Sequence, residues 1–212
     1  MKGAKIVRLR MNIKDLLLAK VPCLTKHGKP AATVSFSKHL CGAATDLTLA
    51  CLSRYQKDLQ MSFYDKNQVI QGTDGILIAL CCHHRCTFDS YINMDYLQGL
   101  GIDKFEFDCM SRMSSWATCG TRIITPSDTN GTQVQTENEE DHINAEGEDT
   151  TPWSYKPKLS HEERRGIGLK CKRLLDKGRL EHLRQEGFCA GLIEFVGLES
   201  SLENIAIWAR RN

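Results

Sequence analysis

The chain has 212 residues, of which 41% are hydrophobic and 25% are charged, and its formal net charge is +2. This length suffices for one hydrophobic core, so we expect a single domain over residues 1–212. No window approaches the ~20 consecutive apolar residues that span a bilayer, and residues 1–15 lack the apolar core of a secretory signal. We therefore expect no membrane partner and a cytoplasmic or nuclear location.

The charge is unevenly distributed along the chain. Residues 128–149 contain eight acidic side chains and no lysine or arginine. The rest of the chain therefore carries a net positive charge, which favours polyanionic partners, although an ordinary solvated basic face is the alternative. Residues 125–152 have too few large apolar side chains to offset the entropy of ordering, so we predict a disordered acidic loop within the domain.

Five short apolar runs rich in β-branched residues have the length of strands. They cover residues 4–10, 32–37, 75–81, 191–197 and 204–210. The link between the last two runs is too short for a helical crossover, so this pair should form an antiparallel hairpin.

Two stretches between these runs have helical spacing. Ala44, Leu47 and Cys51 fall on one face of a helix. A second helix should begin after Ser160, because Ser160 and Glu163 match a capping box. Strands that alternate with helices predict an α/β fold with a mainly parallel sheet.

Two polar motifs follow predicted strands. Lys38 and His39 follow one strand, and a cationic group follows the next: His83, His84 and Arg85. Ligands bind outside the carboxyl ends of the strands in an open parallel sheet, so we expect these five side chains to converge on one cleft. Such a cleft suits a phosphate-bearing substrate, because its cations attract phosphate and lower the pKa of a neighbouring lysine or histidine.

The cysteines of these motifs raise the question of a metal site. Cys82, His84 and Cys86, together with Cys41, would make a tetrahedral zinc site. Structural zinc sites usually take ligands two to four residues apart from two clusters, whereas adjacent residues leaving a strand point to opposite sides. We therefore assign no metal ligand and expect most of the cysteines to be reduced and buried.

Three stretches carry a family resemblance: "SKHLCGAATDLTLACL", "ALCCHHRC" and "FVGLESSLENIAIWARR". They closely resemble the tRNA 2′-O-methyltransferase family that modifies position four of the acceptor stem, and the similarity covers the chain outside the acidic loop. The resemblance implies a Rossmann-like methyltransferase, S-adenosylmethionine as methyl donor and tRNA as partner, with zinc in small modules that precede this domain in the family. The chain is similar to the second half of the catalytic domain, as in a shortened isoform or a fragment.

The resemblance also implies an incomplete sheet. Residues 4–10 resemble the third methyltransferase strand, and the first two strands are absent. In the implied strand order 3-2-1-4-5-7-6, residues 32–37 then present an unpaired apolar edge, which is prone to aggregation. By the same resemblance, the cofactor would contact Asn12 and Ile13 in the adenine-side loop and Ser37 at the end of the fourth strand.

The implied reaction is in-line attack of a ribose 2′-hydroxyl on the sulfonium methyl group, for which an enzyme supplies orientation and desolvation. Lys38 is the first candidate for the general base, and His39 and His83 are the second. Asp46 is the fourth catalytic candidate, because it would orient the base or accept a ligand hydroxyl. A carboxylate in a first helical turn also stabilises the helix, which is the alternative role for Asp46.

His84 and Arg85 would hold phosphate or ribose in this scheme. Lys170 and Arg173 lie in the stretch 156–186, which has ten lysines and arginines against five acids and would follow the tRNA backbone. A solvated amphipathic helix is the alternative explanation for that stretch. A non-catalytic RNA-binding module and a zinc-stabilised module are the alternatives to an enzyme.

Overall fold

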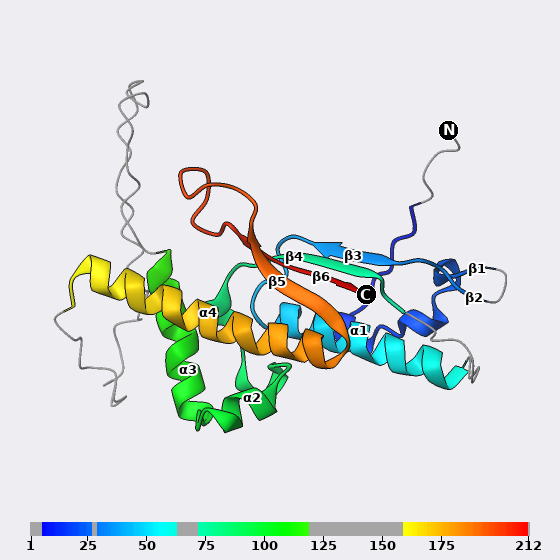
Figure 1. The fold of residues 1–212 in the computed structure, drawn as a ribbon, viewed down its shortest axis with the longest axis horizontal. Coiled ribbons are helices and arrows are strands. Elements are labelled where there is room, and N and C mark those ends of the chain that lie inside the picture. Colours follow the sequence, from blue (N-terminus) through cyan, green and yellow to red (C-terminus); the bar gives the residue numbers. More distant parts are fainter. Residues whose placement is uncertain (1–5, 27–28, 63–71, 119–158, 212) are drawn as a thin grey trace, which may run out of the picture.

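The computed structural model describes residues 6–26, 29–62, 72–118 and 159–211 (Figure 1). The predicted acidic loop 125–152 lies outside these residues. No helix within the described ranges is long and apolar enough to cross a membrane.

The described residues form helices and short strands that alternate along most of the chain. The α-helices are α1 (Ala43–Ser62), α2 (Met94–Gly99), α3 (Lys104–Met113) and α4 (His161–Gln185). The strands are β1 (Thr25–Lys26), β2 (Lys29–Pro30), β3 (Val34–Ser37), β4 (Gly75–Ala79), β5 (Phe188–Glu194) and β6 (Ile205–Arg211). Short 3-10 helices accompany them: η1 (Ile13–Asp15), η2 (Leu18–Lys20), η3 (Pro22–Leu24), η4 (His83–Arg85), η5 (Phe88–Ser90) and η6 (Ser114–Ala117).

The main sheet has four strands in the order β3-β4-β6-β5, and β1 and β2 form a separate antiparallel pair. β3 and β4 are parallel, whereas β6 is antiparallel to both β4 and β5. The predicted hairpin is confirmed, with Leu192 of β5 opposite Ile207 of β6. The prediction of a mainly parallel sheet is wrong for the described strands, because β6 inserts between β4 and β5. The fold is therefore mixed α/β with an open sheet.

The predicted strand 4–10 is not formed in its described part, residues 6–10. Ile6 is 80% exposed, and Val7 and Leu9 are about half exposed. β3 is an edge strand of the described sheet, so no described strand pairs with its outer side. A strand is stable only when a neighbour satisfies its backbone hydrogen bonds, and residues 6–10 remain extended without a ladder because they lack that neighbour.

Helices α1 and α4 cover one face of the sheet (Figure 1). The core on this face comprises Leu49, Leu52, Ile76, Ile78, Leu180, Leu183, Phe188 and Ile207. Side chains alternate between the two faces of a strand, so the residues between these core positions lie on the other face. There, Val34 is 66%, Phe36 80% and Leu77 48% exposed. The predicted apolar edge is therefore present at β3, and it continues onto the sheet face that no described helix covers.

Helix α4 connects this core to a second one around α2 and α3. It begins with the predicted capping box: the Glu163 amide donates to Ser160 Oγ at 3.2 Å, and the Ser160 amide donates to Glu163 Oε2 at 2.7 Å. In its first half, Gly168 allows close contact with the backbone of Ala117 in η6. The second core comprises Cys86, Tyr91, Leu97, Phe107, Met110, Cys171 and Leu175. The middle of α4 therefore lies between two apolar clusters.

Candidate active site at the carboxyl ends of β3 and β4

Two loops meet at one edge of the sheet, because the parallel strands β3 and β4 end there. We call residues 38–42 the β3 loop and residues 80–86 the β4 loop. The loops approach closely at Gly42: its φ is +57°, and an added Cβ would overlap the backbone carbonyl of Arg85. The two motifs that the sequence predicts to converge are thus in direct contact.

Each loop contains one residue in a rare backbone conformation. His39 has a φ of 66° and Cys82 a φ of 48°, and no other non-glycine residue in the described part of the chain has a positive φ. This conformation costs a non-glycine residue roughly 1–2 kcal/mol. Such conformations persist where the surroundings hold them and cluster at functional sites, so they mark this edge as the candidate site.

Four of the predicted site residues in these loops are exposed: Lys38, His39, His84 and Arg85. Partial loss of solvent around the imidazole, followed by the charge of Arg85, lowers the pKa of His84. His84 is therefore mainly neutral at pH 7 and offers hydrogen bonds. Arg85 presents a permanent positive charge to a ligand, whereas Lys38 and His39 carry groups that can exchange a proton.

The other two catalytic candidates are buried, with His83 2% and Asp46 0% exposed. Arg179 of α4 donates to both carboxylate oxygens of Asp46, from Nε to Oδ1 at 3.1 Å and from Nη2 to Oδ2 at 2.7 Å. His83 Nε2 donates to Asp176 Oδ1 at 2.7 Å, and Arg179 Nη1 lies 3.4 Å from the same oxygen. One buried network therefore joins α1, the β4 loop and α4 beneath the exposed residues.

The network contains two carboxylates and two guanidinium groups. Burial alone would raise the pKa of Asp176, but His83, Arg179 and Arg173 hold it below its usual value. Arg173 Nη1 lies 2.7 Å from Asp176 Oδ2. Burial alone would lower the pKa of Arg179, but Asp46 and its other anionic neighbours hold it above its usual value. The two buried carboxylates are therefore compensated by the buried Arg179, by the partly exposed Arg173 and by the hydrogen bond from His83, as a stable buried network requires.

The β4 loop is also fixed from below by α3 and α4. Ser111 Oγ donates to the carbonyl oxygens of His83 at 3.1 Å and Cys86 at 3.2 Å. Arg179 Nη2 donates to Cys86 Sγ at 3.0 Å, and burial raises the pKa of the Cys86 thiol to about 11. This thiol is packed under the loop, so the four-residue zinc set considered from the sequence is not assembled.

A different group of thiols comes together between the loops. The sulfur atoms of Cys41, Cys81 and Cys82 all lie within 4.8 Å of one another. Cys41 Sγ and Cys81 Sγ are 3.4 Å apart. Burial and the neighbouring thiols raise the pKa of Cys81 to about 12, and burial followed by Cys41 raises the pKa of Cys82.

The residues predicted to follow a tRNA backbone lie on α4. Lys170 is exposed, whereas Arg173 is 39% exposed and paired with Asp176. Lys172 is buried, and its Nζ lies 2.7 Å from Glu203 Oε1 in the link between β5 and β6. Some of the basic side chains of α4 are thus held in ion pairs within the fold. Of the two predicted residues, Lys170 is the exposed one and belongs to neither of these pairs.

The predicted cofactor-binding residues lie at two places. Asn12 caps η1 with its side-chain oxygen, and Ile13 is the first residue of η1. This segment packs along α1, where Arg54 Nη2 donates to the carbonyl oxygen of Leu16 at 2.6 Å. Ser37 ends β3 beside the β3 loop, and its buried hydroxyl has no hydrogen-bond partner among the described residues.

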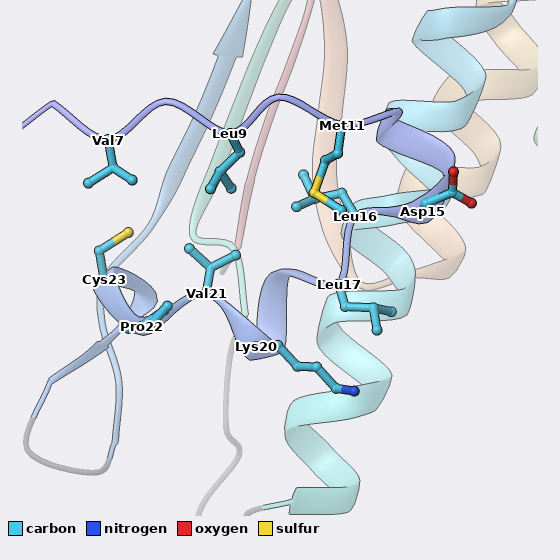
Figure 2. Close-up of a pocket in the computed structure, with 10 residues that line it drawn as sticks. All are labelled: Val7, Leu9, Met11, Asp15, Leu16, Leu17, Lys20, Val21, Pro22 and Cys23. Carbon is cyan, nitrogen blue, oxygen red and sulfur yellow. The ribbon is translucent and has the colours of Figure 1, made fainter.

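An apolar cavity of about 520 Å³ lies beside η1. It is lined by Val7, Leu9, Met11, Asp15, Leu16, Leu17, Lys20, Val21, Pro22 and Cys23. Figure 2 shows Val7 and Leu9 pointing from the extended segment toward Cys23 and Val21. The volume and the apolar walls are those of a small-molecule site.

Sequence reasoning missed the buried partners of Asp46 and His83. Arg179 is 133 residues from Asp46 along the chain, so no local spacing connects them. One signal was available: Asp176 and Arg179 are three residues apart on the face of α4 that also carries buried leucines. Charged residues on an otherwise apolar helical face indicate a buried pair.

Comparison with known proteins gives the family. The family model described as Methyltransferase TRM13 matches residues 1–210. The human tRNA:m(4)X modification enzyme TRM13 homolog is 34% identical over 251 residues, covering 100% of this chain and 50% of that protein. The tRNA:m(4)X modification enzyme TRM13 of Yarrowia lipolytica is 38% identical over 204 residues, covering 95% of this chain and 39% of its own length. The Saccharomyces cerevisiae enzyme of that name is 31% identical over 217 residues, with coverage of 95% and 41%.

The chain thus spans half or less of the length of these relatives. No solved structure matches it. The family model and the relatives agree over nearly the whole chain, and the chain belongs to the TRM13 methyltransferase family.

Proposed function

We propose that this chain provides the substrate-binding end of an S-adenosylmethionine-dependent methyltransferase that acts on the ribose 2′-hydroxyl at position four of the tRNA acceptor stem. The relatives are named as tRNA-modifying enzymes. The observation that carries the proposal is the convergence of the β3 and β4 loops, which present Lys38, His39 and Arg85 at one edge of the sheet. With this role we propose a cytosolic or nuclear location.

The strand order supports a Rossmann-like methyltransferase sheet. The order β3-β4-β6-β5 corresponds to the segment 4-5-7-6 of the order that the family resemblance implies. The open edge of β3 and the uncovered face around Phe36 are the places where the first strands and their helices would pack. The chain spans half of the human relative, so these elements would come from polypeptide outside the matched region.

The residues present fit part of the cofactor. The buried Ser37 hydroxyl, which has no described partner, is available to a polar group at the end of β3. The apolar cavity beside Asn12 and Ile13 suits the adenine ring, because its walls are mainly aliphatic. S-adenosylmethionine supplies an electrophilic methyl group when it is bound.

Within this proposal, the exposed and the buried candidates have different roles. Lys38 accepts the proton of the ribose hydroxyl, with His39 as the second candidate. Arg85 pairs with a phosphate, and the mainly neutral His84 donates a hydrogen bond to phosphate or ribose. His83 and Asp46 are positioning residues, because the buried hydrogen bond of His83 to Asp176 and the buried ion pair of Asp46 with Arg179 fix the β4 loop and the start of α1.

The surface of α4 would contact the tRNA backbone through Lys170 and the exposed part of Arg173. Each phosphate contact releases condensed counterions, so tRNA affinity falls as salt rises. Replacing Lys170 with alanine should reduce the magnitude of the slope of log affinity against log salt concentration by roughly the amount that one phosphate contact contributes.

A second candidate function is tRNA binding without methyl transfer. It is favoured by one observation: the chain spans half of the human relative and leaves a sheet edge open. Calorimetric titration of the folded chain with S-adenosylmethionine, and separately with unmodified tRNA, distinguishes the two candidates. If the chain is part of an enzyme, it should bind both S-adenosylmethionine and tRNA. Salt-sensitive tRNA binding without S-adenosylmethionine binding would favour the binding module.

A further inference from the structure

The three thiols between the loops have the arrangement of metal ligands. Cys41 precedes α1, and Cys81 and Cys82 follow β4, so the group joins two separate segments of the chain. A tetrahedral zinc ion with Zn–S bonds of about 2.3 Å holds its sulfur atoms about 3.8 Å apart. The sulfur atoms here lie within 4.8 Å of one another, and the Cys41–Cys81 distance is 3.4 Å. Small side-chain adjustments therefore suffice to surround an ion.

The backbone at Cys82 explains how two adjacent cysteines face the same ligand. Consecutive side chains of an extended strand point to opposite sides, which from the sequence argues against a shared site. Cys82 has a φ of 48°, in the left-handed region, and this turn breaks the alternation directly after Cys81. Both thiols consequently approach Cys41.

The neighbouring thiol of Cys86 is excluded from this group by its own contacts. Cys86 is buried and bound by Arg179, on the inner side of the β4 loop. Cys41, Cys81 and Cys82 are each only partly buried, so an ion and a water molecule can reach them from solvent. The donor set is therefore three thiols with a fourth position open to solvent.

We propose that Cys41, Cys81 and Cys82 bind one zinc ion through three thiolates, with water as the fourth ligand. Each thiol releases its proton to solvent as its Zn–S bond forms. Soft thiolate ligands select zinc over magnesium or calcium. The ion fastens the β3 loop to the β4 loop and so holds Lys38 and His39 against the start of α1. This site is independent of the proposed methyl transfer, because it rests on the thiol geometry alone.

The test is the zinc content of the untagged chain, purified under reducing conditions without added zinc and measured by mass spectrometry. We expect about one zinc ion per chain. Cys41→Ser and Cys81→Ser should each lose most of the zinc, whereas Cys189→Ser should keep it, because Cys189 is a partly buried thiol in β5 outside the group. The proposal is overturned if folded wild-type protein, after zinc addition and desalting, holds less than about one zinc ion per ten chains.

Cobalt substitution of the wild-type chain keeps the test decisive if a cysteine variant fails to fold. We expect thiolate-to-cobalt charge-transfer absorption with the intensity of three Co–S bonds. Ligand-field bands of tetrahedral cobalt should accompany it. A cobalt spectrum without thiolate bands, or Cys41→Ser protein with undiminished zinc, would contradict the assignment. Neither readout depends on methyl transfer, so failure of the zinc site and failure of the proposed enzyme function are distinguishable.

Discussion

Replacing Gly42 with alanine should push the β3 and β4 loops apart. Gly42 has a φ of +57°, and its added Cβ would overlap backbone atoms of Arg85, which cannot move aside as a flexible side chain can. Gly101 is a matched control, because its φ is +72° but a Cβ there would meet nothing within 4 Å. Both substitutions therefore impose left-handed strain, and only Gly42→Ala adds an overlap.

The magnitudes follow from these two contributions. Left-handed strain costs roughly 1–2 kcal/mol in either variant, and overpacking against backbone adds roughly 1–3 kcal/mol at Gly42. We expect unfolding free energies lowered by roughly 2–5 kcal/mol for Gly42→Ala and roughly 1–2 kcal/mol for Gly101→Ala. Urea denaturation measures both unfolding free energies, and the dependence of free energy on urea concentration should be the same in the variants as in the wild type. Equal losses within about 0.5 kcal/mol would refute the close approach of the two loops.

Three further outcomes follow from burial and exposure. Asp46→Asn should lower the unfolding free energy, measured by urea denaturation, by about 3 kcal/mol, because it removes the negative charge that pairs with the buried Arg179. A loss below about 1 kcal/mol would contradict the buried ion pair. Burial lowers the pKa of His182, so its stabilising contribution is present above its usual pKa of 6.5 and is lost as pH falls below it. Urea midpoints should therefore drop between about pH 7 and pH 5, less so in His182→Gln, and an equal drop in both proteins would contradict this origin. Phe36→Lys should reduce self-association measured by light scattering, because this side chain is 80% exposed on an edge strand, whereas Phe105→Lys, from a 58% exposed position on α3, should change it less.

The parts of the fold that local patterns control agree with the sequence predictions. Ser160 and Glu163 form their capping box because both hydrogen bonds lie within one helical turn. The hairpin of β5 and β6 forms because a short link leaves antiparallel pairing as the available connection. The contact between the β3 and β4 loops follows from parallel pairing, which places the ends of both strands at one edge.

The remainder depends on contacts between distant residues. Residues 6–10 have the composition of a strand, but strand formation requires a neighbour that the described sheet does not supply. The pairing of Asp46 with Arg179 joins α1 to α4, and no periodicity within either helix specifies it. The grouping of Cys82 with Cys41 depends on a left-handed backbone at one residue, which a binary pattern of polar and apolar residues does not encode.

The most direct test of the account is methyl transfer by a chimera in which residues 1–212 replace the matched segment of the human relative. The chimera is incubated with unmodified tRNA and labelled S-adenosylmethionine, and the labelled nucleotide is identified after nuclease digestion. Lys57→Ala is the matched control for Lys38→Ala, because Lys57 is an exposed lysine on α1 roughly 21 Å beyond the start of that helix. We predict a labelled 2′-O-methyl group at position four, retained in Lys57→Ala and lost in Lys38→Ala. A folded chimera that binds the donor and tRNA but leaves position four unmethylated would contradict the account.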